Sequence, residues 1–403
     1  MDHLIYLDHA ATTGCTAGVV EAMLPYFSEH YGNPSSIYRL GAESKKAITE
    51  ARRTIAESLH ADASEIYFTA GGSEADNWAL IAAAEAYSDK GKHIVTSKIE
   101  HHAVLHTCEY LQKKGFQITY IEVDEVGILK LDELEKAIRP DTILISVMFA
   151  NNEIGTIQPI AEIGKLAKER GILFHTDAVQ AYGHLPIDVE ELPIDMLSAS
   201  GHKLHGPKGI GFLYIRKGVK IRSFLHGGAQ ERKRRAGTEN VPGIVGFGAA
   251  VKEAFENMEQ RSEKERQLRD YLITQIESRI PHCRLNGDRQ KRLPGNVNFS
   301  FRFIEGESLL IMLDMKKICA SSGSACTSGS LDPSHVLLAI GLPHEIAHGS
   351  LRLTLSWENT MEEMDYVVEA IAEIVEKLRN MSPLYEDFVK KQHAEGKEQT
   401  NVQ

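Results

Sequence analysis

The chain contains few cysteines, no long apolar run and no excess of positive charge. Its five cysteines are an odd number without C-x-x-C spacing, which argues against a disulfide framework and favours a reducing compartment. No apolar run approaches the ~18 residues of a membrane-spanning helix, and the N-terminus lacks a secretory signal. Because 56 acidic residues outnumber 45 basic ones, the net charge of -11 disfavours binding to nucleic acid. We therefore expect a soluble, cytoplasmic protein without membrane or nucleic-acid partners, large enough at 403 residues for two or three domains.

The first half of the chain alternates between apolar runs and helical stretches. Strands are predicted at residues 65–69, 93–98, 117–123, 142–150, 173–179, 196–200 and 210–215. Helices are predicted between them at residues 73–90, 102–114, 131–138 and 159–170. Strands that alternate with helices of this length indicate crossover connections, and therefore a mainly parallel sheet covered on both faces.

The pattern changes near residue 251. A long charged helix at 253–278, a strand at 296–301, a further helix, two more strands and an amphipathic helix at 361–378 are predicted. We expect a large α/β domain of residues 16–255 and a smaller α+β domain of residues 1–15 and 256–380. A polar, flexible tail is expected at residues 381–403.

A segment rich in Gly, His and Lys follows the predicted strand at 196–200. Lys203 lies there among small residues, where poor solvation lowers the pKa of an amine and makes it available as a nucleophile. Ser200 and His202 are suited to hydrogen bonds with a phosphate. Taken alone, a polar turn with a surface lysine explains the segment equally well.

Asp177 is an acid at the carboxyl end of the predicted strand at 173–179, the edge where open α/β sheets bind ligands. A buried acid there needs a cationic partner, and a protonated pyridine nitrogen would serve. Taken alone, a carboxylate that caps the next helix is the more common explanation.

The segment Thr69-Ala-Gly-Gly-Ser-Glu-Ala75 leads from a strand through two glycines into a helix. The backbone N–H groups near Gly72 and the Ser73 hydroxyl form an anion site suited to a phosphate monoester. The G-x-G-x-x-G pattern of a dinucleotide site is absent. An ordinary helix N-cap is an equally good explanation of these residues.

Cys326 lies in the low-complexity segment Ser321-Ser-Gly-Ser-Ala-Cys-Thr-Ser-Gly-Ser330. Small neighbours give a thiol the access and mobility that a reactive cysteine needs. The other four cysteines lie in sequence typical of a core or a helix face, and we expect them to be structural. The alternative for Cys326 is a flexible linker with an incidental thiol.

His344-Glu-Ile-Ala-His348 matches the H-E-x-x-H pattern of zinc peptidases. Gly349 and a strand-like stretch at 350–356 follow at once, so the helix is too short to hold a zinc ion firmly. We therefore expect no resident metal, and a zinc peptidase is kept as an alternative.

Lys203, Asp177 and the Gly-Gly-Ser helix start form the set that pyridoxal-phosphate enzymes of the aspartate-aminotransferase fold require. Up to about residue 380, the chain resembles cysteine desulfurases of the NifS/IscS type, within the class-V aminotransferases, and its cysteine segment resembles their long-loop group. The motifs that carry the resemblance are Tyr6-Leu-Asp-His-Ala-Ala-Thr-Thr13, Gly32-Asn-Pro-Ser-Ser36, Glu100-His101, Asn151-Asn-Glu-Ile-Gly155, Ser200-Gly-His-Lys203, Gln230-Glu-Arg232, Gly237-Thr-Glu-Asn240, the Cys326 segment and Leu351-Arg-Leu-Thr-Leu355. Two departures are His9, where many relatives have Asn, and Tyr38, where many have His.

The resemblance implies the aspartate-aminotransferase-like fold, fold type I, with a mainly parallel seven-stranded sheet in the large domain. It implies pyridoxal 5'-phosphate as cofactor, bound covalently by Lys203, with His101 stacked on its ring and moving protons. Further cofactor contacts are implied for Gly72, Ser73, Asn152, Asp177, Gln180, Ser200, His202 and, from a partner subunit, Thr238. Substrate contacts are implied for Asn33, Asn152 and Arg352, of which Arg352 holds the carboxylate.

The implied reaction converts L-cysteine to L-alanine and transfers its sulfur to Cys326 as a persulfide. The implied partners are a second copy of the chain and an iron–sulfur scaffold or another sulfur acceptor protein. In delivering sulfur, Cys326 would contact an iron–sulfur cluster transiently. Two further alternatives stay open: a different pyridoxal-phosphate reaction, in which Cys326 is dispensable, and a scaffold that binds the cofactor without turnover.

Overall fold

The computed structural model describes residues 3–322 and 333–400. Within them, the largest sheet has seven strands in the order β2-β8-β7-β6-β5-β3-β4. Their bounds are β2 Ile66–Thr69, β3 His93–Ser97, β4 Gln117–Ile121, β5 Thr142–Ser146, β6 Leu173–Asp177, β7 Met196–Ser200 and β8 Gly211–Ile215. β8 is antiparallel to both of its neighbours and the other pairs are parallel, which confirms the predicted mainly parallel, seven-stranded sheet.

Helices cover both faces of this sheet because its strands are apolar on both sides. Ile94 and Leu144 pack on one face, and their chain neighbours Val95 and Ile145 pack on the other, as the alternation of side chains along a strand requires. The first face is covered by α4 (Gly72–Tyr87) and α5 (His102–Lys113). The second is covered by α1 (Ala17–Met23), α3 (Arg39–Glu57), α6 (Leu131–Ala137), α7 (Ile160–Arg170) and α9 (Val241–Glu256), while α2 (Pro25–Ser28) and α8 (Gln230–Lys233) are short.

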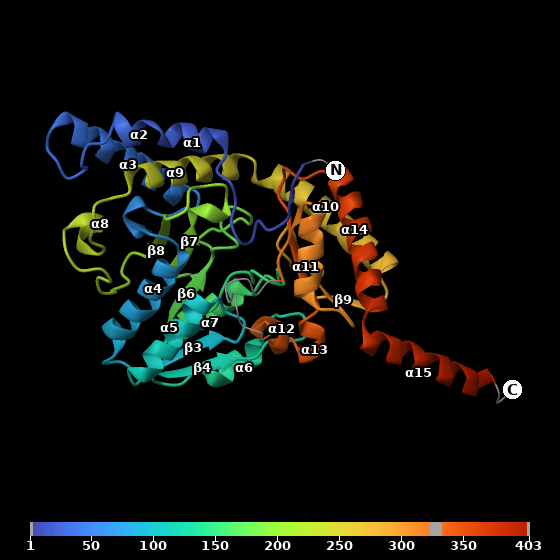
Figure 1. Cartoon of the computed structure of the whole chain (residues 1–403). Coiled ribbons are helices and arrows are strands. Elements are labelled where there is room, and N and C mark those ends of the chain that lie inside the picture. Colours follow the sequence, from blue (N-terminus) through green and yellow to red (C-terminus); the bar gives the residue numbers. More distant parts are fainter. Residues whose placement is uncertain (1–2, 323–332, 401–403) are drawn as a thin grey trace.

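A second sheet is antiparallel and lies in the C-terminal part of the chain. Its order is β12-β10-β9, with bounds Ser350–Thr354, Asn296–Phe301 and Cys283–Leu285. Its apolar residues share a core with helices α10 (Met258–Arg279), α11 (Gly306–Met315) and α14 (Met361–Asn380). Figure 1 shows this smaller α+β body beside the seven-stranded one, with α15 (Pro383–Thr400) extending away from it. The domain boundaries and the flexibility of the tail stay predictions.

The N-terminal segment joins the smaller body. β1 (Ile5–Tyr6) pairs in parallel with β11 (Ile318–Cys319), and a further bridge joins Asp8 to Thr354 of β12. Helices α12 (His335–Ala339) and α13 (His344–Ala347) form a separate small apolar cluster with loop residues that follow β3 and β5. In the part of the chain that the structure describes, no helix is long and apolar enough to cross a membrane.

The predicted single helix at 253–278 is wrong. α9 ends at Glu256 and α10 begins at Met258, with Asn257 between them at φ -121° and ψ 9°. The Asn257 side chain donates its Nδ2 hydrogen to the backbone oxygen of Glu253 at 3.0 Å. Asparagine side chains compete with helical hydrogen bonds in this way, and the charged pattern that continues on both sides conceals the break.

Candidate active site

A pocket of about 480 Å³ opens at the N-terminal end of α4. Its lining includes Gly72, Ser73, Ser200 and His202, the same-chain residues predicted to hold a phosphate. The turn that precedes α4 requires glycine, because Gly71 has φ +152°. The first N–H groups of a helix have no acceptor within it, and the helix dipole makes that end attractive to anions. The pocket therefore combines backbone and side-chain donors suited to a phosphate.

His202 is a neutral donor at this pocket. Its Nδ1 lies 3.1 Å from the hydroxyl of Thr12 in the N-terminal segment. Burial, together with the nearby Lys203 and Lys208, lowers its pKa to about 4. Lys208, an exposed residue, also lines the pocket and brings a basic side chain to it.

Lys203 ends a short 3₁₀ helix, Gly201–Lys203, that follows β7. Its Nζ donates to the backbone oxygens of Ala10 at 2.5 Å and Ala11 at 2.9 Å. Gln180 donates its Nε2 hydrogen to the same oxygen of Ala10 at 3.0 Å. Two predicted cofactor residues, Lys203 and Gln180, therefore meet at one place in the N-terminal segment.

Asp177 ends β6 and is 6% exposed. Its Oδ1 accepts the N–H of Val179 at 2.9 Å, so the carboxylate does cap the following turn. Burial raises the pKa of Asp177, and the Val179 hydrogen bond and the charge of Lys203 oppose that rise. A further cation beside this carboxylate would stabilise its charged form, which suits it to a protonated ring nitrogen.

A buried polar network lies behind Asp177, and the sequence analysis missed it. The two ring nitrogens of His175 lie 2.9 Å from the hydroxyls of Ser146 and Ser198, and its Nε2 lies 3.6 Å from Oδ1 of Asp76. Burial lowers the pKa of His175 to about 3, so its ring is neutral, and burial raises the pKa of Asp76 well above its usual value. The available signal was a histidine two residues before Asp177, on the same face of an apolar strand.

The Glu100-His101 pair follows β3. The Glu100 carboxyl group accepts hydrogen bonds from Ser97 Oγ at 2.5 Å and the N–H of Met148 at 3.0 Å, and burial raises its pKa to about 8. His101 caps α5 by accepting the N–H of Ala103 on Nδ1 at 3.1 Å, which leaves its proton on Nε2. Burial lowers the pKa of His101 to about 4, so the ring is neutral and suited to stacking on another ring.

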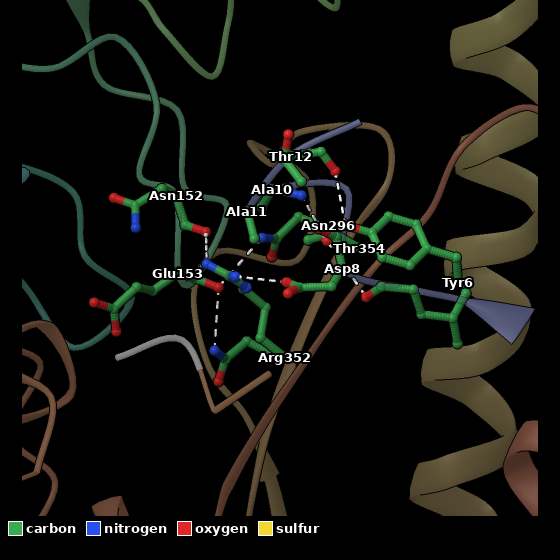
Figure 2. Close-up of polar contacts among 12 residues, drawn as sticks. Tyr6, Asp8, Ala10, Ala11, Thr12, Asn152, Glu153, Asn296, Arg352 and Thr354 are labelled. Carbon is green, nitrogen blue, oxygen red and sulfur yellow. Dashed lines mark hydrogen bonds and ion pairs between the residues drawn. The ribbon is translucent and has the colours of Figure 1, made fainter. Parts of the chain in front are cut away.

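Arg352 lies in β12 and is 3% exposed. Its Nη2 pairs with Oδ1 of Asp8 at 2.8 Å, and its Nη1 donates to the backbone oxygen of Asn152 at 3.0 Å (Figure 2). Its backbone exchanges hydrogen bonds with Ser321 at 2.6 and 3.2 Å, at the start of the segment that carries Cys326. Arg352 therefore joins the N-terminal segment, the Asn152 loop and the beginning of the cysteine segment.

Three predicted site residues are not brought into this group. Asn33 is exposed, and its Oδ1 accepts the N–H of Ser35 at 2.9 Å. Thr238 is exposed next to Gly237, and Cys326 lies outside the described residues. The roles of these three residues stay predictions.

Among the other cysteines, Cys108 is buried and Cys283 and Cys319 are partly buried. Cys15 is exposed in the loop before α1, so the expectation of a core or helix-face position is wrong for it. It follows a glycine in an irregular segment, where neither strand nor helix periodicity decides burial.

The H-E-x-x-H motif gains no support as a metal site. Helix α13 spans only His344–Ala347, and the chain then enters β12 at Ser350. Among the residues that the structure describes, no group of three or more His, Cys, Asp or Glu could hold a metal ion.

The class-V aminotransferase family model matches residues 5–367. The chain belongs to the class-V aminotransferases. It is 62% identical over 380 residues to a cysteine desulfurase IscS of Methanosarcina thermophila, covering 94% of each chain. A cysteine desulfurase IscS of Clostridium botulinum is 57% identical over 392 residues, 97% of this chain and 99% of the relative. A solved NifS-like protein superposes with a TM-score of 0.87 at 40% identity over 93% of this chain and 99% of that one.

Class-V aminotransferases use pyridoxal phosphate, and the residues of this chain fit that group. The pocket at α4 supplies donors for the phosphate, and the buried carboxyl group of Asp177 suits a protonated ring nitrogen. Lys203 follows His202 of the pocket in the chain, and its charge acts on Asp177. The predicted cofactor is confirmed by the family, and the contact made by each residue stays a prediction.

Proposed function

We propose that this protein is a pyridoxal-phosphate-dependent cysteine desulfurase, which converts L-cysteine to L-alanine and passes the sulfur to Cys326. The most similar relatives described above are cysteine desulfurases over nearly their whole length. One structural observation carries the proposal: residues 8–11 contact both the amine of Lys203 and the guanidinium of Arg352. A reactive amine and a carboxylate-binding cation therefore meet at one short segment, as an amino-acid substrate requires.

The cofactor would be held by residues that already lie around the pocket. Bound there, pyridoxal phosphate withdraws electrons from the α-carbon of an amino acid. Gly72, Ser73, Ser200 and His202 would bind the phosphate, Lys203 would bind the cofactor covalently, and Asp177 would face the ring nitrogen. The neutral ring of His101 would stack on the cofactor, and Asn152 and Gln180 would lie beside the ring hydroxyl and the substrate.

Lys203 and Arg352 divide the handling of the substrate. With cofactor and substrate bound, the Lys203 amine would accept the proton of the substrate α-carbon. Arg352 and Asn33 bind the α-carboxylate, and the planar fork of Arg352 matches two carboxylate oxygens. Lys203 and Arg352 therefore act on two different groups attached to the same α-carbon.

Cys326 performs the sulfur transfer. Its thiolate attacks the substrate sulfur, so a new S–S bond forms and the bond between the substrate sulfur and its β-carbon breaks. The electron pair of that bond stays with the β-carbon, which takes up a proton, and alanine leaves. Ser321 lies beside Arg352, and the five residues from there to Cys326 span at most ~17 Å. Cys326 can therefore reach a substrate that Arg352 holds.

The direct test supplies L-cysteine and measures alanine and sulfide together. Cys326→Ala should bind the cofactor as the wild type does and release neither product at a useful rate, because a reactive thiolate is missing. Cys15→Ala removes an exposed thiol elsewhere and should leave activity unchanged. A single wild-type turnover without reductant should add one sulfur to the Cys326 peptide by mass spectrometry. Near-normal alanine formation by Cys326→Ala would mean a different pyridoxal-phosphate reaction.

We further propose a homodimer in which Thr238 reaches the phosphate of the partner's cofactor. Exposed apolar side chains gather near the first helices, at Leu24, Phe27, Tyr31, Ile37 and Tyr38. Thr238 is itself exposed, as a residue that contacts a partner would be. Loss of one hydrogen bond to a charged group in Thr238→Ala should weaken cofactor binding by about 10- to 100-fold. A fully active monomer by light scattering would rule out this arrangement.

The final acceptor would be an iron–sulfur scaffold or another sulfur-carrier protein. A persulfide on Cys326 must leave the site, and a segment of small residues suits such a transfer. The enzyme whose Cys326 persulfide contains labelled sulfur is incubated with a purified scaffold protein. The label should then move from Cys326 to the scaffold. Label that leaves only as free sulfide would argue against a protein acceptor.

A further inference from the structure

We infer that Asp8 is a positioning residue, which holds the guanidinium of Arg352 so that its remaining N–H groups face the substrate carboxylate. The inference rests on the proposed function, because it takes Arg352 as the carboxylate site. It assigns a task to the acid of the Tyr6-Leu-Asp-His sequence, which none of the predicted roles covers.

The first observation is the incomplete pairing of a buried cation. Arg352 donates a hydrogen bond from Nη2 to Asp8 and another from Nη1 to the backbone oxygen of Asn152. Its Nε is buried and has no hydrogen-bond partner among the described residues. A buried N–H without an acceptor is costly, so this edge of the guanidinium is the one suited to a ligand. Figure 2 shows Asp8 and Asn152 converging on the same guanidinium.

The second observation is that Asp8 is fixed to the strand that carries Arg352. Its neighbour Leu7 accepts the N–H of Thr354 at 2.7 Å, and Ala10 donates its N–H to Thr354 Oγ1 at 2.9 Å. Tyr6 also donates its hydroxyl hydrogen to the backbone oxygen of Asp8 at 3.1 Å. Because the backbone is held on both sides, the carboxylate stays in place when the site fills.

This arrangement limits the motion of a long side chain. An arginine has several rotatable bonds, and ordering it on each binding event lowers the affinity for the ligand. The ion pair with Asp8 orders Arg352 in advance and sets the plane of its fork, on which bidentate binding depends. Without it, the substrate carboxylate would have to orient the guanidinium itself.

The opposite role for Asp8 predicts the opposite sign. If Asp8 were a competitor that occupied Arg352 until substrate arrived, its removal would strengthen carboxylate binding. If Asp8 only stabilised the fold, its removal would lower stability and leave carboxylate affinity unchanged.

The test measures binding of L-alanine and of ethylamine, which lacks the carboxylate, to the holoenzyme by the change in visible absorbance. In Asp8→Asn, the Kd for L-alanine should rise about tenfold and that for ethylamine should stay unchanged. The KM for cysteine should rise by a similar factor, while kcat changes far less. Asp132→Asn, an exposed acid in an ion pair with Lys136, is the matched control and should change neither ligand.

Asp8→Glu is the second variant, because it keeps the charge if the asparagine protein folds poorly. Its Kd for L-alanine should also rise, but by a smaller factor than in Asp8→Asn. An unchanged or lowered Kd for L-alanine in both variants would overturn the inference. Alanine binding needs no desulfuration, so a wild type that binds alanine but makes no sulfide would instead contradict the proposed function.

Discussion

The buried acids Asp76 and Glu100 belong to the body of the seven-stranded sheet, and the buried Arg352 lies in the three-stranded sheet. The two kinds of buried group differ in how their charge is compensated. Burial raises the pKa of Asp76 and Glu100, and the histidine beside Asp76 is neutral. Arg352 is buried to a similar depth but has the Asp8 carboxylate and a backbone oxygen as partners.

The difference follows from the chemistry of the two groups. A carboxyl group can be buried without a cation because it can take up a proton, whereas a guanidinium stays charged and must bring its counter-charge. Burial raises the pKa of Asp177 as well, so a cation that binds beside it would stabilise its charged form. Arg352 is instead a permanent part of the folded structure, with one edge left for a ligand.

The largest effect is expected where the buried acid meets the cofactor. Asp177→Asn should lower kcat/KM by at least ~10²-fold, because removing one partner of a buried charge pair costs about 3–5 kcal/mol. The phosphate pocket and Lys203 are unchanged in this variant, so the cofactor should stay bound. The value of kcat/KM and the amount of bound cofactor are both measured on the purified enzyme. Asp195→Asn is the control, since that acid also accepts a backbone N–H but lies at the opposite end of the sheet. An equal loss in both variants would remove the special role of Asp177.

Glu100→Gln should change how stability depends on pH. Burial raises the pKa of folded Glu100 from 4.5 to about 8, so between these values the unfolded chain has already lost its proton. The contribution of Glu100 to stability is therefore present at low pH and lost as pH rises towards 8. Urea unfolding at pH 5 and pH 8 should show a smaller difference in the variant, by up to a few kcal/mol. If the free energy of unfolding changed with pH by the same amount in both proteins, Glu100 would be ionised in the folded state.

The smallest effect is expected at the permanent ion pair. Arg352→Lys keeps a positive charge but loses the fork, so the KM for cysteine should rise about 10- to 100-fold with the resting spectrum unchanged. Arg379→Lys is the matched control, because Arg379 is also buried, and among the described residues its side chain donates hydrogen bonds to the backbone oxygens of Arg302 and His282. Equal kinetics for wild type and Arg352→Lys would place the carboxylate elsewhere.

The sequence predicts the parts of the site that depend on local pattern. Lys203 and Asp177 each lie at the end of an apolar strand, and the two glycines before Ser73 mark the start of a helix. Parallel strands end at the same sheet edge, so the proximity of these residues follows from the fold class alone. The seven-stranded sheet is predictable for the same reason, since its strands are continuous apolar runs between helical stretches.

The rest depends on contacts between distant segments. Asp8 and Arg352 are 344 residues apart, and no periodicity connects them. The pKa shifts of His175 and Asp76 depend on burial, which polar residue types by themselves do not reveal. The break at Asn257 was missed because the charged helical pattern continues on both sides of it.

The pairing of the first strand also has a consequence for synthesis. Ile5 and Tyr6 leave the ribosome before their partners Ile318 and Cys319, which are made more than 300 residues later. At 5–20 residues per second, this delay is roughly 15–60 s, during which the seven-stranded sheet can already fold. Residues 8–11, which hold both Lys203 and Arg352, can settle only after β12 exists. A nascent chain stalled before Ser350 should therefore contain a folded sheet but no complete active site, so the site is assembled last.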